Sequence, residues 1–171
     1  MKAQLLGKLD IETVPVQDRK AAKKLTIRDK KWPGEVEPIG LSVKNPYIQA
    51  LLDFGAEHGF KYKDCDLYTG PCLLPLDGSV LWHDDPGIGH ILSWVIEVEK
   101  FRSSYAFSRD TPALLSTHKR KVHQLDSLKV GDVFVFNGDY GHAWLSNESC
   151  VLVQVTVSAP RARLQGSTVA S

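Results

Sequence analysis

After residue 60 the sequence is a succession of short apolar segments separated by turns, and this feature constrains the fold more than any other. Leu76-Asp77-Gly78 and Asn137-Gly138-Asp139 consist of residues that favour tight reversals of the chain. The segments predict eight strands: 66–74, 79–83, 90–99, 104–107, 121–124, 132–136, 142–145 and 150–157. Short strands of this number favour a β-sandwich or a double-sheet jelly roll. We prefer a jelly roll (double-stranded β-helix) closed enough to hold a small pocket.

Two of these segments alternate clearly between faces. In 150–157 the valines at 151, 153, 155 and 157 share one face, as expected for a strand of period two. In 90–99 one face carries Leu92, Trp94, Ile96 and Val98, and the other carries Ile91, Ser93, Val95 and Glu97. Both segments therefore belong in the sheets of the predicted core.

The preceding region predicts supporting structure. Asn45 followed by Pro46 is a capping residue before a proline suited to the first helical position, and Gly59 supplies a stop. We expect a helix at about 46–58, with Ile48, Leu51, Leu52 and Gly55 on one face. Residues 8–16 alternate as a half-buried strand would, 17–25 could form a brief helix, and 31–40 reads as a loop. We predict one domain over 1–171, with a jelly-roll core at about 62–157 and a supporting region at 1–61.

Composition and charge exclude several classes. The chain has 171 residues, 43% hydrophobic and 24% charged, with a net charge of +1. Fibrous and wholly disordered proteins do not fit these values. We expect no membrane span and no signal peptide, because the apolar runs are too short. The first 31 residues hold nine Lys/Arg against four Asp/Glu, so this basic region could contact nucleic acid or be a solvated helix or arm.

The cysteines indicate a reducing compartment. Three cysteines are present, Cys65, Cys72 and Cys150, and an odd count without a signal peptide suggests reduced thiols in the cytoplasm. Cys65 and Cys72 are seven residues apart, which is not the spacing of a zinc knuckle. We therefore expect no metal site built on cysteine.

Histidines and aspartates gather instead at two predicted strand ends. In an extended segment His83 and Asp85 share a face and Asp84 points away. His142, from a later strand, would complete a set of two imidazoles and one carboxylate. Such a set leaves positions open on an octahedral metal and is the pattern of non-haem Fe(II) oxygenases, where a bidentate 2-oxo acid and dioxygen fill the open positions. The alternative is that all three are polar turn residues with ordinary hydrogen bonds.

The segments around these residues resemble a known family. WHDDPGIGHILSWVIEVE (82–99) resembles the His-x-Asp strand of 2-oxoglutarate/Fe(II)-dependent oxygenases, especially the prolyl-4-hydroxylase-like branch, and LKVGDVFVFNGDYGHAWLSN (128–147) resembles their distal-histidine motif. The resemblance covers about 66–157. It implies a jelly-roll fold, Fe(II) held by His83, Asp85 and His142, and 2-oxoglutarate as co-substrate.

The sequence departs from this family in one respect. Its members usually hold the far carboxylate of 2-oxoglutarate with a basic residue on the strand after the distal histidine, but no basic residue appears here before Arg161. Some relatives place a lysine after His-x-Asp instead, which makes Lys100 the candidate anchor and Arg102 a weaker one. Tyr68 could add a hydroxyl, although core packing explains it equally well. Lys100 could equally be a solvated lysine at a strand end.

Three function classes remain open on these grounds. The leading one is an oxygenase acting on a small molecule, a peptide side chain or a nucleobase. The second is a cupin-like jelly-roll protein that binds a metal or ligand without oxidation. The third is a structural or interaction module that docks through its basic N-terminal region. We interpret His90 as a hydrogen-bonded strand histidine rather than a ligand, and His58 as a cation at a helix end.

Overall fold

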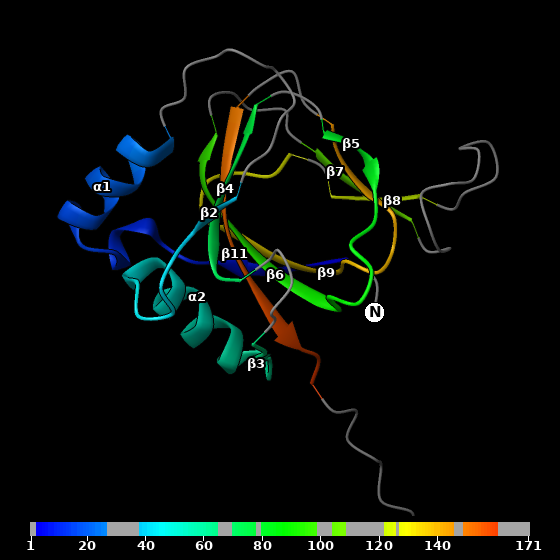
Figure 1. Cartoon of the computed structure of the whole chain (residues 1–171), viewed down its shortest axis with the longest axis horizontal. Coiled ribbons are helices and arrows are strands. Elements are labelled where there is room, and N and C mark those ends of the chain that lie inside the picture. Colours follow the sequence, from blue (N-terminus) through cyan, green and yellow to red (C-terminus); the bar gives the residue numbers. More distant parts are fainter. Residues whose placement is uncertain are drawn as a thin grey trace, which may run out of the picture.

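The computed structural model describes residues 3–26, 38–64, 70–77, 80–98, 104–108, 122–125, 127–145 and 149–160. Figure 1 shows three layers: two helices, a larger sheet in the middle and a smaller sheet facing it. The larger sheet contains β1 (Gln4–Lys8), β2 (Ile39–Gly40), β3 (Lys61–Tyr62), β4 (Cys72–Asp77), β6 (His90–Val98), β9 (Asp132–Asn137) and β11 (Ser149–Ser158). The smaller sheet contains β5 (Val80–His83), β7 (Ser104–Ser108), β8 (Val122–Leu125) and β10 (His142–Leu145).

The eight strands from β4 to β11 have jelly-roll topology. The strand order is β9-β6-β11-β4 in one sheet and β5-β10-β7-β8 in the other, and every pairing is antiparallel. The chain thus crosses repeatedly between two facing sheets, which is the arrangement of a double-stranded β-helix. The predicted fold is confirmed, and seven of the eight predicted strands match the observed ones to within one residue at each end.

The first strand of this core differs from its prediction. β4 spans Cys72–Asp77, later than the predicted 66–74, and residues 65–69 lie outside the described ranges. Leu76 and Asp77, expected in a turn, continue the strand because they pair with Cys150 and Ser149 of β11. Pairing with a central strand outweighs the local turn preference at these two positions.

The N-terminal region contributes the expected brief helix, but its strand lies earlier in the chain than expected. β1 pairs with β9 and adds an edge to the larger sheet. The prediction of a strand at 8–16 is wrong. Beyond Lys8 the chain forms a 3-10 turn (Ile11–Thr13), and the Asp10 side chain caps this turn by accepting a hydrogen bond from the amide of Glu12. Local bonding by an aspartate competes with strand pairing in this way. The brief helix is found as α1 (Val16–Thr26).

Helix α2 (Pro46–Glu57) forms as predicted. The Asn45 side chain accepts a hydrogen bond from the amide of Tyr47 at 3.0 Å, a cap that contributes about 1 kcal/mol. Its apolar face packs on β6 and β11 of the larger sheet, with Ile48 and Leu51 completely buried. Burial of each such side chain stabilises the fold by about 1.5–3 kcal/mol.

The larger sheet is buried on both faces because helices cover one and the smaller sheet covers the other. Leu92 and Trp94 pack beneath the helices, while Ile91 and Val95 face the interior between the sheets. A register shift opposite Val151 and Leu152 breaks this alternation. The expectation that Glu97 shares the face of Ile91 is therefore wrong: Glu97 lines a pocket on the helix side together with its neighbour Ile96. A β-bulge of this kind places two consecutive residues against one.

Candidate metal centre

His83 and His142 are direct neighbours on adjacent strands. β5 ends at His83 and β10 begins at His142, and these two residues pair across the smaller sheet. Their imidazole rings lie 4.3 Å apart between centroids, tilted by 56°. Cross-strand pairing therefore holds two imidazoles side by side at one end of the barrel.

Asp85 joins them from the turn that follows β5. Its Oδ2 atom lies 3.4 Å from Nε2 of His142, and its backbone N–H donates a hydrogen bond to the carbonyl of Gly138 at 2.8 Å. His83, Asp85 and His142 each offer a donor atom, and these atoms all lie within 4.8 Å of one another. The structure thus brings together the three side chains selected from the sequence and leaves Asp84 outside the group. Metal binding itself stays a prediction.

The surroundings of His142 determine how its ring is presented. The ring is buried, with 2% of the side chain exposed, and lies 4.9 Å from the ring of Phe136. Nδ1 lies 2.9 Å from the carbonyl oxygen of Tyr140. Because a carbonyl can only accept, Nδ1 carries a hydrogen and Nε2 faces the Asp85 carboxylate. A second partner of this kind fixes the orientation of metal-binding histidines in general.

The surroundings of Asp85 favour the ionised form of its carboxyl group. Partial burial by itself raises the pKa of Asp85, but the hydrogen bond with His142 and the positive fields of His142 and His83 together outweigh it and lower the pKa. A carboxylate that stays ionised beside two imidazoles is the form in which it binds a cation.

Two loops close tightly around Asp85. A Cβ atom at Gly138 would lie 3.0 Å from Cδ1 of Ile91 and 3.5 Å from Cβ of Asp85. The backbone of Gly138 can approach this closely only because it has no side chain. The loop before β10 therefore packs directly against the residue that carries the carboxylate.

The other residues selected from the sequence have mixed outcomes. Lys100, Arg102 and Tyr68 lie outside the described residues, so the proposed anchor of the co-substrate stays a prediction.

His90 does not belong to the metal group. Its buried Nε2 atom has no hydrogen-bond partner, so the hydrogen bond expected for this histidine is not found at that atom. Burial lowers the pKa of His90. His58 ends α2, where Nδ1 lies 2.9 Å from the carbonyl of Phe54.

Sequence reasoning missed a buried polar pair inside the barrel. Nε2 of Gln154 donates to Oγ of Ser93 at 2.9 Å, and both side chains are buried. Thr156, two residues further along β11, is also buried. The available signal was the alternation of β11: when the valines face the helices, Gln154 and Thr156 must face the interior.

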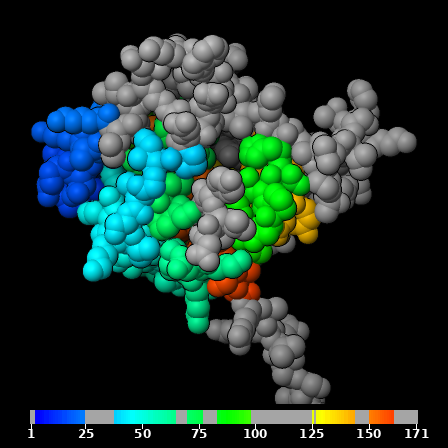
Figure 2. All heavy atoms as spheres, viewed as in Figure 1, coloured from blue at the N-terminus to red at the C-terminus, as the bar shows by residue number. Residues whose placement is uncertain are grey.

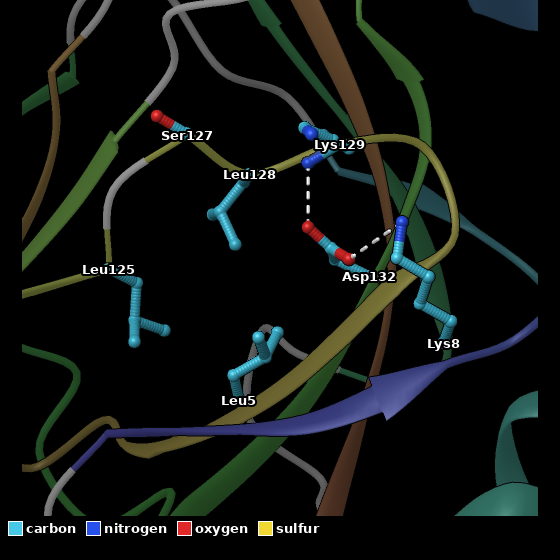
Figure 3. A pocket seen from close by; sticks show the side chains of 7 residues that line it. All are labelled: Leu5, Lys8, Leu125, Ser127, Leu128, Lys129 and Asp132. Atoms are coloured by element: carbon cyan, nitrogen blue, oxygen red, sulfur yellow. Dashed lines mark hydrogen bonds and ion pairs between the residues drawn. The ribbon is translucent and has the colours of Figure 1, made fainter.

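A separate pocket of about 300 Å³ lies at the opposite end of β9 (Figure 3). Leu5, Leu125 and Leu128 form its apolar walls. Its one carboxylate, Asp132, accepts a hydrogen bond from the amide of Lys129 at 2.7 Å and lies 3.7 Å from the ammonium of Lys8. Because both partners of Asp132 come from the protein, this group serves to join β1 to the start of β9.

The basic N-terminal region is exposed at α1, which forms one edge of the surface in Figure 2. Lys20, Lys23 and Lys24 are all exposed and follow the spacing of one helix face. Among the described residues, no helix is long and apolar enough to cross a membrane.

Comparisons with known proteins support the fold alone. No protein-family model matches this sequence, and no curated protein sequence matches it. The crystal structure of AviO1 from Streptomyces viridochromogenes Tue57 is similar, with a TM-score of 0.53 and 13% identity over 94% of this chain and 91% of that one. At such low identity this likeness shows a shared fold.

Two other solved structures match more weakly. The Fe(II)/(alpha)ketoglutarate-dependent dioxygenase TqaL gives a TM-score of 0.48 at 9% identity, covering 95% of this chain and 84% of that one. A cupin-2 domain containing protein from Shewanella frigidimarina NCIMB 400 gives 0.40 at 14% identity, covering 82% and 92%.

Proposed function

We propose that the protein is a non-haem Fe(II), 2-oxoglutarate-dependent oxygenase whose metal is held by His83, Asp85 and His142. The observation that carries this proposal is the convergence of the three donor atoms within 4.8 Å. Two imidazoles and one carboxylate form the ligand set typical of this enzyme class. With 2-oxoglutarate and dioxygen, a bound Fe(II) would supply the oxidising chemistry of a hydroxylase.

The chemistry of the donor set fits a cation. Around the His142 ring, Nδ1 faces a carbonyl oxygen at 2.9 Å and Nε2 faces a carboxylate oxygen at 3.4 Å. Both neighbours are acceptors, so a metal-free ring satisfies them only when both nitrogens carry hydrogen. A cation held by His142 and Asp85 would satisfy Nε2 and the carboxylate with a neutral ring. The arrangement of these acceptors around the ring therefore suits a bound cation.

The remaining residues have supporting tasks in this proposal. Phe136 and the buried position of His142 limit the access of water to one side of the site. Lys100 would hold the far carboxylate of 2-oxoglutarate, with Tyr68 adding a hydroxyl. A buried carboxylate without a cationic or hydrogen-bonding partner is unfavourable, so a co-substrate of this kind requires such a group.

The decisive experiment measures metal binding and co-substrate turnover in the same preparation. We expect one Fe(II) per chain under anaerobic conditions and, on admission of oxygen, slow conversion of 2-oxoglutarate to succinate detected by NMR. Wild-type protein that binds no Fe(II), or an Asp85→Ala variant that binds it equally well, would contradict the proposal.

One observation favours a second candidate, a jelly-roll protein that binds metal without using 2-oxoglutarate. β11 presents the uncharged Gln154 and Thr156 to the interior, and the strand contains no lysine or arginine. Stoichiometric metal binding with no succinate formation in the same assay would favour this candidate.

The substrate we propose is a small molecule, a peptide side chain or a nucleobase. The exposed lysines of α1 support contact with a nucleic acid. If they bind phosphates, affinity for a short single-stranded DNA should fall steeply with salt. A Lys20→Glu/Lys24→Glu variant should then lose that affinity.

A further inference from the structure

The loop that carries Asp85 and the loop that leads to His142 are joined by three hydrogen bonds. Two are formed by backbone alone: Asp85 N–H to the Gly138 carbonyl at 2.8 Å, and Gly138 N–H to the Gly89 carbonyl at 2.7 Å. In the third, the amide of Gly87 donates to Oδ1 of Asp139 at 2.7 Å. Only the third depends on a side chain.

Asp139 contacts the central peptide of the turn that begins at Asp85. Asp85, Pro86, Gly87 and Ile88 form a tight turn in which the Ile88 amide donates to the Asp85 carbonyl at 3.4 Å. Proline in the second position and glycine with φ of +85° in the third are the features of a type II turn. The N–H of Gly87 belongs to the central peptide, whose orientation distinguishes type II from type I. By accepting from this N–H, Asp139 favours the type II orientation of the central peptide, in the turn that begins at Asp85.

Asp139 is itself held in place. Its backbone amide donates to the side-chain oxygen of Asn137 at 3.0 Å, and the Tyr140 amide donates to the Asn137 carbonyl at 3.2 Å. The carbonyl of Tyr140 in turn contacts the ring of His142. One short segment therefore orients both a histidine and an aspartate of the candidate metal centre.

We propose that Asp139 is a positioning residue for the metal ligand Asp85, acting through its hydrogen bond to Gly87. This inference rests on the proposed metal site and adds to it a residue outside the three ligands. It requires the acceptor oxygen of Asp139 in its present place and does not require its negative charge. Partners of metal ligands commonly change metal affinity by about 10- to 100-fold when they are removed.

The test separates acceptor geometry from charge with two crossed variants. Asp139→Asn keeps an acceptor in the same place and removes the charge, while Asp139→Glu keeps the charge and moves the acceptor. The probe is Co(II) alone, titrated into metal-free protein and followed by calorimetry and by visible absorption. We expect near wild-type affinity and spectrum for Asp139→Asn. Asp139→Glu and Asp139→Ala should bind about tenfold or more weakly with altered spectra.

Two controls accompany these titrations. Asp53→Ala removes an exposed carboxylate on α2, distant in sequence from both loops, and should leave Co(II) affinity unchanged. Thermal melting in EDTA reports on folding without metal, and all variants should melt close to the wild type. If Asp139→Ala does not fold, the Asn and Glu variants still decide the question.

The results distinguish this inference from the function on which it rests. If Asp85→Ala abolishes Co(II) binding but Asp139→Ala and Asp139→Glu bind as the wild type does, the positioning role is wrong. If Asp139→Asn is as weak as Asp139→Ala, charge rather than geometry is responsible, which also overturns it. If the wild type binds no Co(II), the proposed function fails first.

Discussion

Oδ2 of Asp85 lies 3.4 Å from Nε2 of His142, although 57 positions separate the two residues in the sequence. Asp85 lies in the turn after β5 and His142 begins β10, and His83 completes the group from the strand paired with His142. At a distance of 3.4 Å, Oδ2 of Asp85 and Nε2 of His142 are close enough for both to contact one ion.

The first prediction compares two neighbouring aspartates. Asp85→Ala removes the only carboxylate of the group, so we expect metal binding to be lost. Asp84→Ala removes an equal charge one residue away and should leave binding nearly unchanged. Equilibrium dialysis of both variants against Fe(II) under anaerobic conditions measures the difference. Equal losses in the two variants would show that general negative charge, and not a specific ligand, attracts the metal.

The second prediction concerns the close approach at Gly138. In Gly138→Ala the new Cβ would meet Ile91 at 3.0 Å and press toward Asp85. Since overpacking a rigid site forces backbone shifts that cost about 1–3 kcal/mol, we expect a lower melting temperature and weaker metal binding. Differential scanning calorimetry and a metal titration measure the two effects.

A matched control for that variant is Gly40→Ala. Gly40 has no atom within 4 Å of an added Cβ, so this substitution should change neither property. Wild-type metal affinity in Gly138→Ala would mean that the two loops are free to move apart.

How far the sequence could predict this site depends on the residue. His142 could be identified from the sequence because it begins a strand within a regular pattern. Strand pairing then places it opposite His83. Asp85 was selected for a reason that does not hold: β5 ends at His83, so strand alternation does not extend to position 85. A turn and a bond to the distant Gly138 place it instead. Contacts between loops far apart in sequence leave no periodic signal.

The fold was more predictable than its irregularities for a related reason. Alternating apolar residues and turn residues are local signals, and they located most strands of the core to within one residue. The bulge beside Glu97 and the 3-10 turn at Ile11–Thr13 arise where pairing partners or a single aspartate decide the backbone. Asp139 was likewise seen only as a turn residue, because its contact with Gly87 spans 52 positions.

The third prediction concerns the two buried cysteines. Cys72 and Cys150 face the protein interior, and burial raises the pKa of Cys72 to about 12 and also raises that of Cys150. Because the thiolate is the reactive form, both should resist a thiol reagent at pH 8 in the folded protein. In a Cys65→Ser background we expect no rapid reaction with DTNB until denaturant is added. Rapid native reaction of two thiols would contradict the burial of these side chains.

The last prediction decides what holds the co-substrate. If Lys100 binds the far carboxylate of 2-oxoglutarate, Lys100→Ala should raise the concentration needed for succinate formation by about tenfold or more, since a hydrogen bond to a charged group contributes about 1.5–3 kcal/mol. Fe(II) binding should stay nearly unchanged, because Lys100 is not a ligand in this proposal. The measurement is the dependence of succinate formation on 2-oxoglutarate concentration, with Fe(II) saturating.

The buried pair of Ser93 on β6 and Gln154 on β11 is the alternative to Lys100 as the group that holds the co-substrate. Gln154 and Ser93 face the interior and bond to each other at 2.9 Å, so they could accept a polar group without a cation. Gln154→Leu leaves Ser93 without its partner and should lower stability by about 1–3 kcal/mol, and adding Ser93→Ala should recover part of that loss. If Lys100→Ala has no effect and the double variant alone raises the 2-oxoglutarate requirement, an uncharged pair is the anchor. If neither changes it, neither Lys100 nor this pair is the anchor. If the wild-type protein forms no succinate, metal binding without oxidation becomes the better description.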